Sequence, residues 1–124
     1  MELKHVAFQI NSSDEIKGFY QGLLGMEIIR GFELDKEKAL KVFGVQNGTK
    51  AVLLGKGDIR FEVFVDKGQK APSFNHICFS VPDRENLVKE AMSRNFEVKR
   101  FKRSKFDLIF IKDNSGNIFE IKQL

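Results

Sequence analysis

Two stretches of the chain follow one pattern: Lys4–Ile10 is KHVAFQI and Asn75–Val81 is NHICFSV. In both, a histidine precedes a run in which every second residue is apolar. A period of two is typical of a β-strand with one buried face. The chain has only two histidines, and both occupy the same place in this repeated strand. The repeat therefore predicts a fold built from two related modules.

A helix is expected after each of these strands. Ser13 or Asp14 can cap a segment whose apolar residues have helical spacing, and Gly25 can end it. Asp83 can cap a second segment, which ends near Asn95. Both halves thus continue from a strand into a helix, as duplicated modules should.

Three further strands are expected in each half, separated by turns rich in glycine and asparagine. They are Glu27–Phe32, Thr49–Leu54 and Arg60–Val65 in the first half, and Phe96–Phe101, Asp107–Lys112 and Asn117–Lys122 in the second. Each half is then a βαβββ module. We expect an α+β fold in which the two modules form a curved, mostly antiparallel sheet cup with helices on the outer face.

The length of 124 residues fits one compact domain. We expect a single domain over residues 1–124, with module one at 1–66, a linker at 67–73 and module two at 74–124. One segment breaks the symmetry: Asp35–Gly44 has an acidic cap, helix-forming residues and a terminal glycine. This pattern predicts a short extra helix in module one.

Composition narrows the function classes. The first residues lack the pattern of an export signal, and no apolar run is long enough to cross a membrane. The single Cys78 excludes an internal disulfide, so we expect a cytoplasmic protein without a membrane partner.

Much of the positive charge behind the net charge of +4 falls within Lys99–Lys105. This segment is either a solvated surface or a contact for an acidic small molecule. Nucleic acid is not expected, because the 13 Phe residues follow strand patterns typical of a core.

Four residues form a candidate metal site. Strand parity places His5 and His76 on the face opposite the apolar residues, and places Glu62 and Glu120 there too. Each module thus offers one imidazole and one carboxylate at equivalent positions. Taken singly, such a His or Glu is commonly structural or solvated. Their repetition favours convergence on one divalent ion, for which Ni, Zn, Co, Mn and Fe suit the mixed nitrogen and oxygen donors.

The quoted segments resemble the vicinal oxygen chelate superfamily, which includes glyoxalases, bleomycin resistance proteins and extradiol dioxygenases. The resemblance extends over essentially the whole chain. The segments that carry it are His5–Phe8, Phe19–Met26, Phe61–Glu62, Asn75–Ile77 and Asp113–Glu120. The order His5, Glu62, His76, Glu120 is similar to the ligand pattern of bacterial glyoxalase I.

This resemblance implies a metal-dependent lyase or isomerase acting on a small, thiol-conjugated substrate. Glu120 would take a proton from a carbon next to an oxygen bound to the metal, and Glu62 could return it. Glyoxalase I usually has Arg where this chain has Gln9, which argues against glutathione as the thiol. The superfamily also implies a homodimer.

Further residues are candidates for substrate contact. Gln9, Phe64, Cys78 and Ser80 share the face of the predicted ligands, and Arg103 could bind an anionic group. Ordinary core packing is the competing interpretation for Phe64, and small cavity-floor packing for Cys78.

Alternatives on the same scaffold remain open at this point. They are an acyl-CoA epimerase, a thiol transferase, an iron-dependent dioxygenase and a drug-binding protein without catalysis. Because such binders typically lack the full ligand set, all four residues together favour an enzyme.

Overall fold

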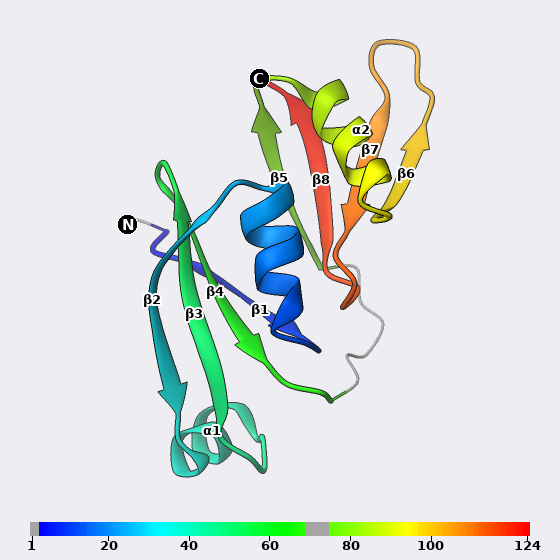
Figure 1. The fold of residues 1–124 in the computed structure, drawn as a ribbon. Coiled ribbons are helices and arrows are strands. Elements are labelled where there is room, and N and C mark those ends of the chain that lie inside the picture. The colour runs from blue at the N-terminus through cyan, green and yellow to red at the C-terminus, as the bar shows by residue number, and fades with distance from the viewer. Residues whose placement is uncertain (1–2, 69–74) are drawn as a thin grey trace. The chain divides into compact units, whose positions relative to one another are not determined.

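The structure is a computed structural model that describes residues 3–68 and 75–124. The chain divides into two compact units, Met1–Gln69 and Lys70–Leu124, and each is described by itself (Figure 1). The predicted linker at 67–73 lies, from residue 69 onward, outside the described residues. Among the described residues, no helix combines the length and apolar composition needed to cross a membrane.

Unit 1 is a four-stranded sheet in the order β1-β4-β3-β2. Its elements in chain order are β1 (Val6–Ile10), the helix η1 (Ile16–Leu23), β2 (Glu27–Leu34), α1 (Lys36–Phe43), β3 (Thr49–Lys56) and β4 (Ile59–Val65). β1 pairs with β4 in parallel, and the other neighbours are antiparallel. The module βαβββ is therefore present, with α1 inserted between its second and third strands.

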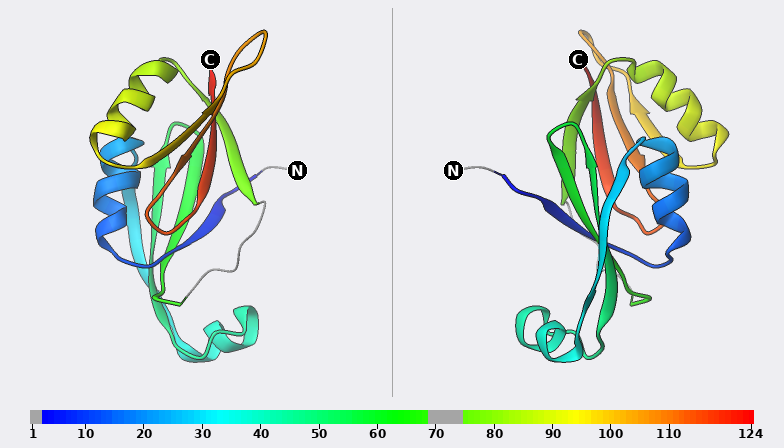
Figure 2. Two further views of the ribbon diagram at one scale, coloured as in Figure 1. Left: turned by 90° about the vertical axis from the view of Figure 1, so that its right-hand side faces the viewer. Right: turned by 60° about the vertical axis from the view of Figure 1, so that its left-hand side comes forward.

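Unit 2 repeats this order as β5-β8-β7-β6. Its elements are β5 (His76–Val81), α2 (Arg84–Ser93), β6 (Glu97–Phe101), β7 (Leu108–Lys112) and β8 (Ile118–Gln123). Again the first and last strands are parallel and the rest antiparallel. Both sheets are twisted and curved (Figure 2). The predicted α+β fold of two mostly antiparallel βαβββ modules is confirmed.

One face of each sheet is covered by the helix of its own unit. In unit 1 the ring of Tyr20 from η1 packs against Phe8 and Phe61, with ring centroids 6.2 and 6.3 Å away. In unit 2 Ala91 of α2 is fully buried, and Phe79 packs against Phe119 across β5 and β8. The apolar residues of the repeated strands thus face the helices, as their alternation predicts.

The starts of α1 and α2 follow the capping residues in the sequence, whereas the expected Ser13 or Asp14 cap of η1 is not formed, because Glu15 is at its N-cap and makes no side-chain cap bond. The Asp35 carboxylate accepts a hydrogen bond from Lys38 N at 2.8 Å, and Gly44 ends α1 with a left-handed backbone. Asp83 likewise caps α2 by accepting from Asn86 N. The predicted extra helix and the second helix are confirmed.

The first helix differs from expectation in its geometry. η1 is a π-helix, in which backbone bonds reach five residues back; Leu24 N, for example, donates to Phe19 O. The apolar residues that predicted this helix, among them Phe19, Tyr20 and Leu23, are buried as expected, but their spacing did not indicate the π-helical form. Gly25 ends the helix with positive φ, as expected.

Candidate metal and substrate site

In unit 1 the fold brings His5 and Glu62 together. His5 directly precedes β1, and the parallel register places Ala7, two residues further on, opposite Glu62 of β4. Because side chains two residues apart share a face, both point to the same side of the sheet. His5 Nε2 lies 2.7 Å from Glu62 Oε2, which is hydrogen-bonding distance.

Unit 2 makes the equivalent pair with the same offset. His76 begins β5, and Cys78, two residues further on, lies opposite Glu120 of β8. His76 Nε2 lies 3.7 Å from Glu120 Oε2, a longer distance than in unit 1. The other oxygen, Glu120 Oε1, lies 3.8 Å from Lys122 Nζ. The second carboxylate is thus shared between an imidazole and an ammonium group.

Both pairs lie on the sheet face that the unit's first helix leaves open. Phe61 and Val63, on either side of Glu62, are buried towards η1, while Phe119 and Ile121 flank Glu120 in the same way. The histidine side chains are 47% and 43% exposed, against 17% and 15% for the glutamates. Each imidazole is therefore open to a ligand while its carboxylate is held within the sheet.

The side chains gathered in each unit are the correct kind for a divalent ion. Imidazole nitrogen and carboxylate oxygen are donors that Zn, Ni, Co, Mn and Fe accept. Within residues 3–68 and 75–124, no group of three or more His, Cys, Asp or Glu side chains arranged around a metal position is found. Each unit thus contributes a pair, and convergence of His5, Glu62, His76 and Glu120 on one ion stays a prediction.

Two of the predicted substrate residues line one cavity in unit 1. Gln9 and Phe64 border a space of about 200 Å³ on the open face, together with residues from α1 and the loop that follows it. Gln9 Nε2 donates to Gly68 O at 3.2 Å. The cavity wall includes Ala7, the residue opposite Glu62. Gln9 and Phe64 therefore lie next to the His5–Glu62 pair.

Cys78 and Ser80 are exposed on the same face as His76. Partial desolvation, followed by the negative charge of Glu120, raises the pKa of the Cys78 thiol above its ordinary value. Because only the thiolate is a good nucleophile, this environment does not favour Cys78 as a catalytic nucleophile. It leaves both side chains accessible for contact with a ligand.

Arg103 lies away from the His76–Glu120 pair. It belongs to the connection between β6 and β7, next to the Phe101–Leu108 pair that ends the pairing of these two strands. His76 lies at the opposite end of the sheet, where Ile118 pairs with both His76 and Lys112. Its guanidinium stacks over the Phe106 ring, 5.4 Å from the centroid. A role for Arg103 in substrate binding stays a prediction.

Part of the basic stretch is already paired within unit 2. Arg100 contacts Glu85 at 2.5 Å and Asp107 at 3.1 Å, and Lys102 lies 3.5 Å from Asp107. Desolvation works against ionisation of Asp107, but Lys102 and Arg100 outweigh it and lower the pKa of that carboxyl group. These cations are paired with carboxylates on the surface of unit 2, which agrees with the solvated-surface interpretation.

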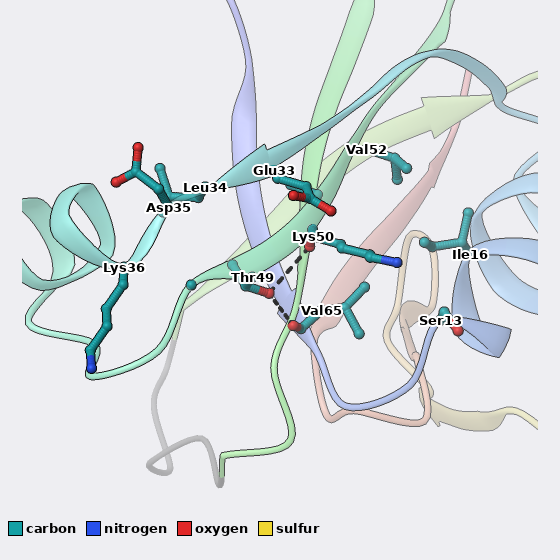
Figure 3. A pocket seen from close by; sticks show the side chains of 12 residues that line it. Ser13, Ile16, Glu33, Leu34, Asp35, Lys36, Thr49, Lys50, Val52 and Val65 are labelled. Carbon is teal, nitrogen blue, oxygen red and sulfur yellow. Dashed lines mark hydrogen bonds between the residues drawn. The ribbon is translucent and has the colours of Figure 1, made fainter.

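A larger open hollow of about 970 Å³ lies on the opposite, helix-facing side of the unit 1 sheet. Figure 3 shows Lys50 extending towards Ile16 there, and the Thr49 hydroxyl donating to Val65 O at its floor. Glu33, the register partner of Lys50, lines the same hollow. Since strand parity separates this face from Glu62, the hollow is not part of the candidate site.

The sequence did not identify the α1 side of the cavity. Ala39, Phe43 and Val45 form this wall. The only feature of the sequence that pointed to this wall was the predicted helix itself. It has several apolar side chains, but the sequence pattern did not indicate what they pack against. Which of them meets the sheet depends on how α1 folds back, and helical periodicity alone does not specify that.

Comparison with known proteins agrees with this architecture. The chain is similar to a glyoxalase family protein from Enterococcus faecalis (24% identity, TM-score 0.74, covering 97% of this chain and 95% of the other). It is also similar to the trypanothione-dependent glyoxalase I of Leishmania major (20%, 0.74, 99% and 86%). A mutant of the fosfomycin resistance protein FosX from Listeria monocytogenes, complexed with Mn(II) and a dihydroxypropylphosphonic acid, matches as well (16%, 0.75, 97% and 90%). These likenesses define the class of fold.

The sequence model of the Glyoxalase/Bleomycin resistance protein/Dioxygenase superfamily matches residues 2–121. The chain therefore belongs to this superfamily, as its repeated strands suggested. None of the curated proteins matches the chain.

Proposed function

We propose that the chain is a divalent-metal-dependent lyase or isomerase of the glyoxalase type. It would move a proton at a carbon beside a carbonyl group of a small, thiol-conjugated substrate. The observation that carries this proposal is the duplicated pair, His5 with Glu62 and His76 with Glu120, at the same register offset on the open face of each unit.

The donor set supports the metal. His5, Glu62, His76 and Glu120 would hold one ion, of the kind that Ni, Zn, Co, Mn or Fe provides. Such an ion supplies Lewis acid chemistry, which polarises a carbonyl and makes the adjacent carbon more acidic. The Listeria FosX relative carries Mn(II), which supports an ion of this class.

The two glutamates differ in a way that suits two roles. Glu62 is held at 2.7 Å by His5, whereas Glu120 lies 3.7 Å from His76 and near Lys122. The less tightly held carboxylate is the better candidate for a general base, because a proton acceptor must be able to reach the substrate carbon. We assign proton removal to a Glu120 oxygen and proton return to Glu62.

The thiol part of the substrate is not glutathione in this proposal. Gln9, which stands where the resembling enzymes have Arg, donates to the backbone at Gly68 and brings no cation to pair with a carboxylate. Small carbonyl compounds conjugated to several thiols, including coenzyme A, form the appropriate substrate panel. The proposal includes a homodimer in the cytoplasm, and sedimentation equilibrium tests the dimer directly.

Metal analysis tests the site itself. Untagged protein, loaded with Ni or Zn and then desalted, is expected to retain one ion per chain. His5→Ala and His76→Ala should each lower the retained metal sharply, because each removes one of the two nitrogen donors. Ser93→Ala, on the exposed end of α2, is the matched control and should retain metal. Unchanged metal content in both histidine variants would disprove the proposed site.

A further inference from the structure

Helix α1 makes unit 1 different from unit 2. It joins β2 to β3 at Lys36–Phe43, whereas the equivalent strands β6 and β7 are joined without a helix. Its position is held at both ends of the connection. The Asp35 cap fixes its first turn, and a Cβ at Gly48 would lie only 2.7 Å from Leu34 O. The backbones at the two ends of the insertion therefore pack closely against each other.

The insertion lies at the end of the unit 1 sheet where β2 ends and β3 begins, and it contacts the face that carries Glu62 (Figure 1). Phe43 packs on Phe64 with ring centroids 5.8 Å apart, and Phe32 meets the same ring edge-on at 6.1 Å. Between α1 and the sheet lies the cavity of about 200 Å³. Phe64 is two residues beyond Glu62 on β4, which is about 7 Å along a strand. The cavity wall thus begins at Phe64, the next side chain after Glu62 on the same face of β4.

The lining of this cavity is mostly apolar. Its walls are Ala7, Phe8, Leu34, Ala39, Phe43, Val45 and Phe64, with Gln9, Thr49 and Asp66 as the polar members. The Thr49 hydroxyl donates to Val65 O, the Gln9 amide to Gly68 O, and Asp66 Oδ1 accepts from Gly68 N. These polar groups bond to the protein backbone, so the remaining surface offers apolar contact to a ligand.

Size and ring geometry indicate which group fits. An apolar cavity of about 150 Å³ holds benzene, so one aromatic ring with a small substituent matches the space available. Aromatic rings favour edge-to-face or offset contacts at centroid distances of roughly 4.5 to 7 Å, which Phe43 and Phe64 can both provide. Phe43 is 58% exposed without a ligand, and an occupying ring would cover part of that apolar surface.

We infer that this cavity binds an aryl group of the substrate, and that Phe43 is a specificity-determining residue. The substrate class is then a small, thiol-conjugated aryl compound whose oxygen-bearing end extends towards His5 and Glu62. This assignment of substrate class rests on the proposed function, but binding of the ring to the cavity does not require a metal. The two ideas can therefore fail separately.

Fluorine NMR of the full chain tests the inference. The probe is fluorobenzene, with fluoroacetate as a small polar comparison, measured on Zn-loaded protein and on the same protein after EDTA treatment. Fluorobenzene is expected to bind equally in both states and fluoroacetate not to compete. Phe43→Ala should weaken fluorobenzene binding by about tenfold. Phe43→Leu should restore most of it.

Val42→Ala is the matched control, since Val42 lies on the same helix, is 68% exposed and is not among the cavity residues. It should leave fluorobenzene affinity unchanged. Absence of binding, or equal effects of Phe43→Ala and Val42→Ala, would overturn the inference. So would a change of molecular mass in Phe43→Ala, because Phe43 would then contact a second copy. Failure of the wild-type chain to retain metal, with fluorobenzene binding intact, would instead refute only the proposed function.

Discussion

The two units share strand order and the offset that pairs histidine with glutamate, but their surroundings differ. In unit 1 His5 Nε2 lies 2.7 Å from Glu62 Oε2, and the pair adjoins a cavity that is partly lined by α1. In unit 2 the pair is at 3.7 Å and adjoins Lys122 and the Cys78 thiol. A duplicated module therefore supplies two similar histidine–glutamate pairs, and the differences around them are the basis for the separate roles proposed for Glu62 and Glu120.

The largest expected effect separates the two glutamates. Glu120→Gln should lower turnover by about 10² to 10⁴-fold, the usual contribution of a general base, while the fold and part of the metal binding remain. Glu62→Gln should mainly lower metal retention, because its carboxylate is the more tightly held. Steady-state kinetics and metal analysis on both variants would measure this. Full turnover in Glu120→Gln would contradict the division of roles.

The next effect compares the two hairpin turns that precede the glutamates. In unit 2 Asp113 is 4% exposed and its carboxylate accepts from Asn117 N at 2.8 Å and Asn117 Nδ2 at 2.7 Å. In unit 1 the corresponding turn carries the exposed Asp58. Asp113→Ala should lower the free energy of unfolding by about 2 to 3 kcal/mol, because it removes the acceptor of buried donors.

Asp58→Ala is the matched control and should change the free energy of unfolding by less than about 0.5 kcal/mol. Urea denaturation of both variants would measure the difference. Equal values would mean that the buried turn of unit 2 adds no special stability.

A smaller, pH-dependent effect concerns the insertion in unit 1. Hydrogen bonds from the Lys38 backbone, then from its side chain, lower the pKa of Asp35 from its reference value of 3.8. A carboxyl group with a lowered pKa stabilises the folded state above its unfolded pKa, and this stabilisation is lost as pH falls through the folded pKa. Asp35→Ala should therefore lower the melting temperature at pH 7.

That difference in melting temperature should shrink as pH falls through the lowered pKa of Asp35 in the folded state, since the carboxyl group of the wild type is then protonated. Thermal unfolding of wild type and Asp35→Ala from pH 7 downward would follow it. A difference that is constant over the whole pH range would contradict the role of the charged cap.

The smallest expected effect tests the environment of the unit 2 pair. Desolvation and the charge of Glu120 raise the pKa of Cys78, so removing that charge should increase the thiolate fraction. Glu120→Gln should modestly speed alkylation of Cys78 by iodoacetamide at pH 8. Glu62→Gln, in the other unit, is the control. An unchanged rate in Glu120→Gln would show that Glu120 does not affect the thiol, and a slower reaction would contradict the sign of the expected effect.

Most of the fold was predictable, for a physical reason visible in particular residues. Val6 and Phe8, like Ile77 and Phe79, are large apolar residues that alternate with small or polar neighbours, and a half-buried strand requires that alternation. Asp35 and Asp83 mark helix starts because their carboxylates satisfy otherwise unpaired backbone N–H groups. The π-helical form of η1 was not predictable, since the spacing of its apolar residues did not indicate it.

The candidate site was predictable only in part. Parity placed His5 with Glu62, and His76 with Glu120, on open faces, but it contains no information on distance or on the neighbours of each pair. Gln9 and Phe64 were named as pocket residues, whereas Phe43 was not. Its contact with Phe64 depends on how a helix more than twenty residues away in the chain folds back onto β4.

By itself the sequence determined that two βαβββ modules repeat and that each carries one histidine and one glutamate on the same sheet face. Alternation and capping are local properties, and a local pattern encodes them fully. Only the tertiary structure decided the parallel register that pairs each histidine with its glutamate, and the cavity between α1 and the sheet. Both arise between segments distant in the chain, where packing rather than local preference sets the geometry.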